Sequence, residues 1–191
     1  MTTTMDIQIQ SPPLDDLQLA RTAREDANAF AELYRRHLTR VYRYQMAHVG
    51  NVKDAEDLTS QTFMAALEGI GSFRGSGSFG AWLMGIASKK RAFFFRAHRF
   101  DIAIESARHV GDGVPTDKAA YQRMQTEAVS RALRQISPDR ADAISLTFFG
   151  GLSNAEAGQA LGKSEAAVKM LVSRGLQDLR ERTSLRMEAE Q

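Results

Sequence analysis

Apolar residues recur at intervals of three and four through most of this chain of 191 residues, and no stretch of useful length alternates apolar with polar residues. The first pattern is the repeat of a helix with one buried face, whereas strict alternation is typical of a half-buried strand. Glycines punctuate the periodic segments where helices should end, at Gly50, at 69–80, at Gly150-Gly151 and at Gly162. The sequence therefore predicts an all-α protein.

The periodic segments fall into two groups, which predicts two small helical domains. Between the groups, residues 100–117 lose the periodicity and contain a Gly-Asp-Gly-Val-Pro stretch with turn chemistry. The expected organisation is an N-terminal tail that can hold a short helix at 1–24, a first domain at 25–99, a flexible linker at 100–117, a second domain at 118–183 and a C-terminal tail at 184–191.

Composition excludes several classes of protein. A hydrophobic content of 43% is typical of a folded globular chain. The absence of cysteine excludes disulfides and cysteine-based zinc sites, and it is compatible with a reducing cytoplasm. No apolar run approaches the ~18 residues that span a bilayer, and the N-terminus lacks the pattern of a secretory signal. We therefore expect a cytoplasmic protein without membrane insertion.

The stretch 78–99 concentrates aromatic and basic residues. It holds the only tryptophan, Trp82, four phenylalanines and five Lys or Arg residues, and no acidic residue stands between Glu68 and Asp101. The net charge is only +2, so this clustering, rather than the total, indicates an anionic partner. A helix of this kind offers rings for unstacked bases and cations for phosphates. The same pattern is also typical of a core helix with a solvated basic back.

Two further segments carry polar residues with a functional interpretation. Asp54, Glu56 and Asp57 fall in the first turn of a predicted helix, where they complement the helix dipole. Near the C-terminus, two predicted helices separated by 162–164 form a plausible helix-turn-helix, a unit that places its second helix in the DNA major groove. An ordinary helical hairpin with a mixed-charge surface explains the second pattern equally well.

The order of these segments resembles the extracytoplasmic-function, or group IV, sigma factors of the sigma-70 family, over about 30–96 and 129–182. The matching motifs of the first part are Asp54-Ala-Glu-Asp-Leu58, Gln61-Thr-Phe63, Phe73-Arg-Gly75, Ser78-Phe79, Ala81-Trp82-Leu83 and Ile86-Ala87. Those of the second part are Leu152-Ser153, Glu156, Leu161-Gly162, Ala167-Val168-Lys169 and Arg174. Each motif is short, and their series in this order carries the resemblance.

The resemblance implies a region 2 bundle of three or four helices, a region 4 helix-turn-helix, and a non-catalytic factor that binds core RNA polymerase and promoter DNA. It implies polymerase contacts at Asp54, Glu56, Asp57, Leu58 and Gln61. It implies −10 contacts at Phe73, Arg74, Phe79, Lys89, Lys90, Arg91 and Arg96, with Trp82 packing the helix against the core. It implies −35 contacts at Ser164, Lys169, Met170, Ser173 and Arg174. The family is commonly held inactive by an anti-sigma factor, so such a partner is expected too.

Three positions depart from the family pattern. Lys89 stands where asparagine is usual, Phe93 where aspartate is common and Leu171 where arginine is common. An amide both donates to and accepts from a base edge, whereas lysine only donates. These departures bear on the −10 sequence preference and on one −35 contact.

Two other classes of protein remain open at this point. A stand-alone helix-turn-helix regulator would bind duplex DNA without polymerase, and a protein-interaction module would bury 79–97 in a partner's helix bundle. The sequence predicts no enzyme, cofactor, metal or small-molecule substrate, because the four histidines are scattered and neither a phosphate-binding loop nor a Rossmann glycine pattern occurs.

Overall fold

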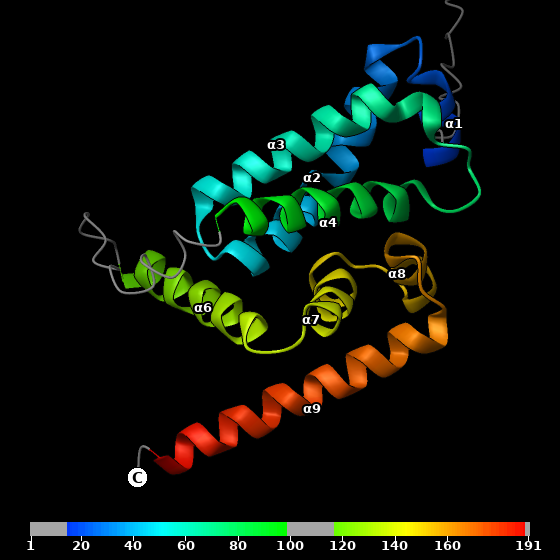
Figure 1. The fold of residues 1–191 in the computed structure, drawn as a ribbon. Helices are drawn as coiled ribbons and strands as arrows, with labels where there is room; N and C mark the ends of the chain where they lie inside the picture. Colours follow the sequence, from blue (N-terminus) through cyan, green and yellow to red (C-terminus); the bar gives the residue numbers. More distant parts are fainter. Residues whose placement is uncertain (1–14, 99–116, 190–191) are drawn as a thin grey trace, which may run out of the picture.

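The computed structural model describes residues 15–98 and 117–189, and all regular structure within these ranges is helical. The first unit comprises α1 (Asp16–Thr22), α2 (Ala27–Val49), α3 (Val52–Gly69), the 3-10 turn η1 (Ile70–Ser72) and α4 (Phe79–Ala97). The second comprises α6 (Asp117–Arg134), α7 (Pro138–Ile144), the π-helical η2 (Ser145–Phe149), α8 (Asn154–Leu161) and α9 (Glu165–Ala189). The predicted all-α fold with two domains is confirmed (Figure 1). The expected linker at 100–117 lies, except for its last residue, outside the described residues.

Helix ends lie where short-range chemistry predicts them. Gly50 closes α2 with φ +79°, a left-handed conformation that glycine adopts without steric cost. Asn51 then begins α3, because its side chain accepts a hydrogen bond from the Asp54 backbone N–H at 2.9 Å. Ser153 and Glu156 form a capping box at the start of α8. These caps fix the directions in which the helices enter the two units.

One predicted helix is interrupted. The sequence indicates a continuous helix from the Ser137-Pro138 cap to Gly150, yet α7 gives way after Ile144 to the wider π-helical turn of η2. The Gly150 backbone N–H donates to the Ser145 carbonyl at 2.9 Å, five residues back. Because a π turn contains one residue more than an α turn, the side chains that follow it point in directions different from those of an uninterrupted α-helix. Leu146 is fully buried while Phe148 is 62% exposed.

One apolar core runs through both units. Tyr44 and Met84 of the first unit and Leu146, Ala157 and Val168 of the second belong to the same cluster, and each is 0% exposed. In this closed arrangement α2 packs against α6 and η2, and α4 packs against α8. Helix α9 contacts α7 and α8 and runs along the side of the molecule that faces away from the first unit (Figure 1).

Candidate nucleic-acid interface

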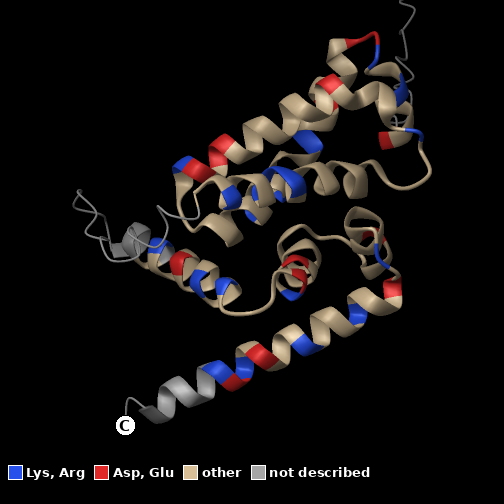
Figure 2. Ribbon diagram, viewed as in Figure 1, with Lys and Arg blue, Asp and Glu red and all other residues tan. Residues whose placement is uncertain are grey.

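The acidic start of α3 presents a polar surface near one end of the first unit (Figure 2). The residues there that were predicted to contact polymerase and that are exposed or half-buried are Asp54, Glu56, Asp57 and Gln61. Leu58, the fifth, is 1% exposed, so it holds α3 in place from beneath. Further along the helix, Met64 is 63% and Leu67 50% exposed. These two apolar side chains extend the accessible face of α3, and motif matching had not included them.

The two aromatic residues predicted to line or shape a base-capturing surface are buried. Phe73 is 6% and Phe79 2% exposed, and their rings meet edge to face at 5.6 Å. The Trp82 ring lies 5.5 Å from each of them, as its expected packing role requires. Arg24 donates to the Phe73 carbonyl at 3.1 Å. The three rings therefore pack together beneath the glycine-rich loop and support it.

Above these rings the glycine-rich loop forms a shallow hollow, which we call the loop hollow. It is lined by Ser72, Phe73, Arg74, Ser76, Gly77, Ser78, Ala81, Trp82 and, from the second unit, Gln159. Arg74 is exposed at its rim. Beside it, the Ser78 hydroxyl donates to a carboxylate oxygen of Glu156 on α8 at 2.8 Å. Helix α8 therefore reaches directly into the neighbourhood of the loop.

The predicted −10 cations on α4 are not equivalent. Lys89 and Arg96 are exposed and Lys90 is half-buried. Phe93 is 66% exposed, so a hydrophobic ring lies in solvent among these cations. Arg91 differs from all of them, because it is only 9% exposed.

Arg91 forms the centre of a buried polar cluster between the two units. Its Nη2 lies 2.6 and 2.8 Å from the two carboxylate oxygens of Asp142 on α7. The Tyr44 hydroxyl donates to Asp142 at 3.4 Å, and Arg91 Nη1 lies 3.4 Å from His48 Nδ1. The sequence analysis missed Asp142, although an acid within the apolar run 141–144 is a signal of a buried partner.

Burial sets the protonation of this cluster. It raises the pKa of the Tyr44 hydroxyl and lowers the pKa of His48 well below its ordinary value, an effect that Arg91 reinforces. Burial also raises the pKa of Asp142, while the Arg91 guanidinium acts in the opposite direction. The cluster therefore holds a neutral His48 beside the Arg91–Asp142 ion pair.

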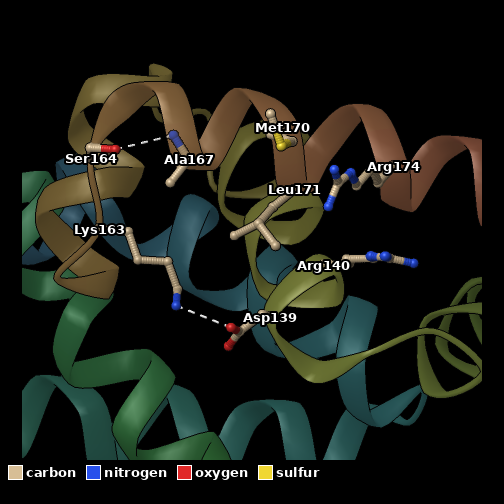
Figure 3. A pocket seen from close by; sticks show the side chains of 8 residues that line it. All are labelled: Asp139, Arg140, Lys163, Ser164, Ala167, Met170, Leu171 and Arg174. Carbon is tan, nitrogen blue, oxygen red and sulfur yellow. Dashed lines mark hydrogen bonds and ion pairs between the residues drawn. The ribbon is translucent and has the colours of Figure 1, made fainter.

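All five residues predicted to read the −35 element are exposed. They are Ser164, Lys169, Met170, Ser173 and Arg174. Figure 3 shows the groove on this face, which Met170, Leu171 and Arg174 of α9 line on one side. Arg140 lies on its opposite side, and Lys163 pairs with Asp139 there at 3.0 Å. Ser164 caps α9, since its hydroxyl oxygen accepts from the Ala167 backbone N–H at 3.2 Å.

The turn before α9 depends on Gly158. A Cβ at this position would lie 2.6 Å from the Lys163 carbonyl oxygen, closer than side chains approach backbone atoms. Gly162 then ends α8 with φ +66°. The tight connection brings α8 and α9 together in the manner expected of a helix-turn-helix.

Within residues 15–98 and 117–189, no group of three or more His, Asp or Glu side chains is placed to hold a metal ion. None of the helices described there combines the length and apolar character needed to cross a membrane.

Family comparisons match both halves of the chain. The Sigma-70 region 2 model matches residues 33–100, and the Sigma-70 region 4 model matches residues 126–179. The extracytoplasmic-function sigma factor BldN of Streptomyces coelicolor is 36% identical over 159 residues, covering 81% of this chain and 60% of BldN. The sigma factor CarQ of Myxococcus xanthus is 31% identical, covering 81% of this chain and 88% of CarQ. The chain thus spans less than two thirds of the length of BldN and most of the length of CarQ.

Comparison of the fold with solved structures agrees with these family matches. The solved structure of CnrH in complex with the cytosolic domain of CnrY matches with a TM-score of 0.70 over 90% of this chain and 97% of that chain. The sequence identity there is 24%, so this likeness concerns the fold. Together the helical pair of domains and the two region matches define a protein of the sigma-70 type. The chain belongs to the extracytoplasmic-function branch of the sigma-70 family of RNA polymerase sigma factors.

Proposed function

We propose that this chain is a sigma factor that binds core RNA polymerase and directs promoter-specific initiation in the cytoplasm, without a catalytic role of its own. The observation that carries the proposal is the outward face of α9. Five predicted DNA-reading residues are exposed there, in a chain whose other half matches sigma-70 region 2. A stand-alone regulator would account for α9 but not for the region 2 half.

The acidic face of α3 would bind core polymerase. Glu56, Asp57 and Gln61 are exposed, and the capped helix end holds Asp54 beside them. Leu58 would contribute by holding α3 in position, since its side chain is buried. Only Asp54 lies in the first turn of α3, where the helix dipole favours a carboxylate, whereas Glu56 and Asp57, which were predicted there, lie in the second turn.

The loop hollow and α4 would bind the opened −10 strand. Lys89, Lys90 and Arg96 would hold phosphates together with Arg74 at the rim of the hollow, while Phe73 and Phe79 shape the surface from below. Arg91 would join them where it becomes accessible. Unstacking costs a few kcal/mol per step, which pocketed bases and backbone contacts must offset.

The α9 groove would read the −35 duplex. The Arg174 guanidinium suits a guanine edge, Met170 offers apolar contact to a thymine methyl, and Lys169 suits a phosphate. Ser164 and Ser173 provide short hydroxyls at the same face. Leu171, which stands where the family commonly has arginine, would make the groove floor apolar.

A protein inhibitor is proposed as a further partner. CnrH, whose fold this chain shares, was solved with the cytosolic domain of CnrY. By analogy, an anti-sigma factor would bind this chain and keep it from polymerase. Affinity capture from the native cell followed by mass spectrometry tests this point.

The main experiment mixes the chain with core polymerase and asks for comigration, promoter-dependent transcripts and permanganate-reactive thymines at the −10 element. A simple regulator would melt nothing. The double variant D57A/Q61A should weaken polymerase binding at least tenfold, whereas S60A, an exposed site on the same helix, should not. No association of the wild-type chain at micromolar concentration would contradict the proposal.

A further inference from the structure

The contact between the two units covers parts of the proposed −10 surface. Arg91 is buried under α7, and in the loop hollow the Gln159 side chain lies so near Gly77 that a Cβ there would overlap it. Ser78, which begins α4, is bonded to Glu156 on α8. The five residues predicted to read the −35 element, in contrast, are all exposed.

The dimensions of a promoter are incompatible with the closed arrangement. The −10 and −35 elements are about 25 base pairs apart, or roughly 85 Å of duplex at ~3.4 Å per base pair. A compact chain of 191 residues has a radius of gyration of roughly 16 Å. Its two DNA surfaces cannot lie that far apart unless the units separate.

The geometry points to an intramolecular latch, formed by Arg91 of α4 and Asp142 of α7, that holds the two units closed and keeps the −10 surface covered until polymerase and DNA separate them. This inference rests on the proposed function for its consequence, but the latch itself is a property of the free chain.

The chemistry of the cluster suits a two-state contact. Arg91 and Asp142 are each less than 10% exposed, and they lie between helices of different units. A buried ion pair is costly to form but far more costly to break on one side, because the remaining charge is then buried alone. In the open state both groups regain water, and Arg91 becomes available for a phosphate.

A second contact offers an independent way to open the latch. Gly85 on α4 lies against the backbone of α8, and an added Cβ would be 3.3 Å from the Ala160 carbonyl oxygen. A leucine at this position would wedge the helices apart. It changes no charge, and it favours the helical state of α4 over glycine.

The test uses the whole chain of 191 residues, which contains no cysteine, with fluorophores at N28C on α2 and Q177C on α9. Energy transfer should be high in the otherwise wild-type protein. D142N keeps the shape of the side chain but removes the charge, and it should shift the ratio of open to closed molecules by roughly a hundredfold. D139N, on the same helix but in an exposed pair with Lys163, is the matched control and should leave transfer unchanged.

G85L should lower the transfer as well, and circular dichroism should show that both variants keep their helices. Wild-type transfer in a helical D142N overturns the latch. If D142N loses its helices, G85L decides, and wild-type transfer in G85L overturns the proposal.

A polymerase arm separates this inference from the proposed function. Adding core polymerase and forked promoter DNA should lower transfer in the wild-type chain. D142N should bind core polymerase more tightly, by at most about a hundredfold, because less of the binding free energy is spent on opening. Failure of the wild-type chain to bind polymerase would contradict the function and leave the energy-transfer result standing, whereas binding without any loss of transfer would contradict the opening step.

Discussion

The two proposed DNA surfaces of this protein use the same residue type in opposite environments. Arg174 on α9 is exposed in a groove, whereas Arg91 on α4 is buried and paired with Asp142. An exposed arginine is ready to bind, and its removal costs the fold little. A buried arginine stabilises the closed arrangement first and can contact DNA only after that arrangement changes.

The largest expected difference concerns stability. R91A leaves the Asp142 carboxylate buried without its partner, so we expect the free energy of unfolding to fall by about 3–5 kcal/mol. R174A removes an exposed side chain and should change it by less than about 0.5 kcal/mol. Urea denaturation monitored by circular dichroism checks both values, and equal effects would remove the contrast.

The next effect concerns duplex binding. R174A should weaken binding to a −35 duplex by about 1–3 kcal/mol and relax discrimination at one base pair, as expected for loss of a base-edge contact. K169A should weaken all duplexes alike. Fluorescence anisotropy with matched and substituted duplexes measures this. If R174A weakened binding to all duplexes equally, Arg174 would contact the DNA backbone instead of a base edge.

A smaller effect concerns the salt dependence of forked-promoter binding. K89A and R96A each remove an exposed cation of α4, so each should reduce the slope of log affinity against log salt by about 0.7. R35A, at an exposed arginine of α2 outside the proposed surface, serves as the control. An unchanged slope in both α4 variants would take them off the DNA surface.

The mildest test uses pH. Burial lowers the folded-state pKa of His48, so between that value and about 6.5 the unfolded or opened state binds a proton that the closed state excludes. The contribution of neutral His48 to the stability of the closed state is therefore fully present above about pH 6.5, and it is lost as the pH falls below that value. His48 faces Tyr44, Arg91, Asp142 and Arg134 from four helices.

We expect energy transfer in the labelled chain to fall on acidification from pH 7.5 to 5.5. H48Q should flatten the profile. The pKa of His37 is lowered too, chiefly by burial, and it should give H48Q a residual dependence of the same sign in thermal denaturation. A steeper profile in H48Q would contradict the assignment.

Local chemistry made most of the fold predictable. Helix starts at Asn51 and Ser153 follow from side chains that bond a backbone N–H three residues on, and ends at Gly50 and Gly162 follow from left-handed backbone. Such features depend on a few neighbouring residues. The closed packing does not, because it joins α4 to α7 and α8 across about 50 to 80 residues of sequence.

The same distinction between local chemistry and long-range packing explains which features of the candidate site could be predicted. The α9 face was predictable because one helix presents it to solvent. The burial of Arg91, Phe73 and Phe79 was not predictable, because helical spacing identifies a face of a helix without showing what covers it. Only Asp142, an acid among apolar neighbours, gave a hint of long-range pairing. The roles of these residues at a promoter stay predictions until the experiments above are done.

The π-helical turn η2 gives the second unit some tolerance to a change in chain length. A single residue advances an α-helix by about 100°, and the widened turn at Ser145–Phe149 absorbs such an offset. Deleting one residue there would remove the extra residue of the π turn and restore regular winding, so the elements downstream, including α9, would keep their orientation. A deletion within the regular turns of α7 would instead rotate those elements by about 100°. Relatives that lack one residue in the π-helical segment should therefore present their duplex-reading helix at the same angle to the first unit.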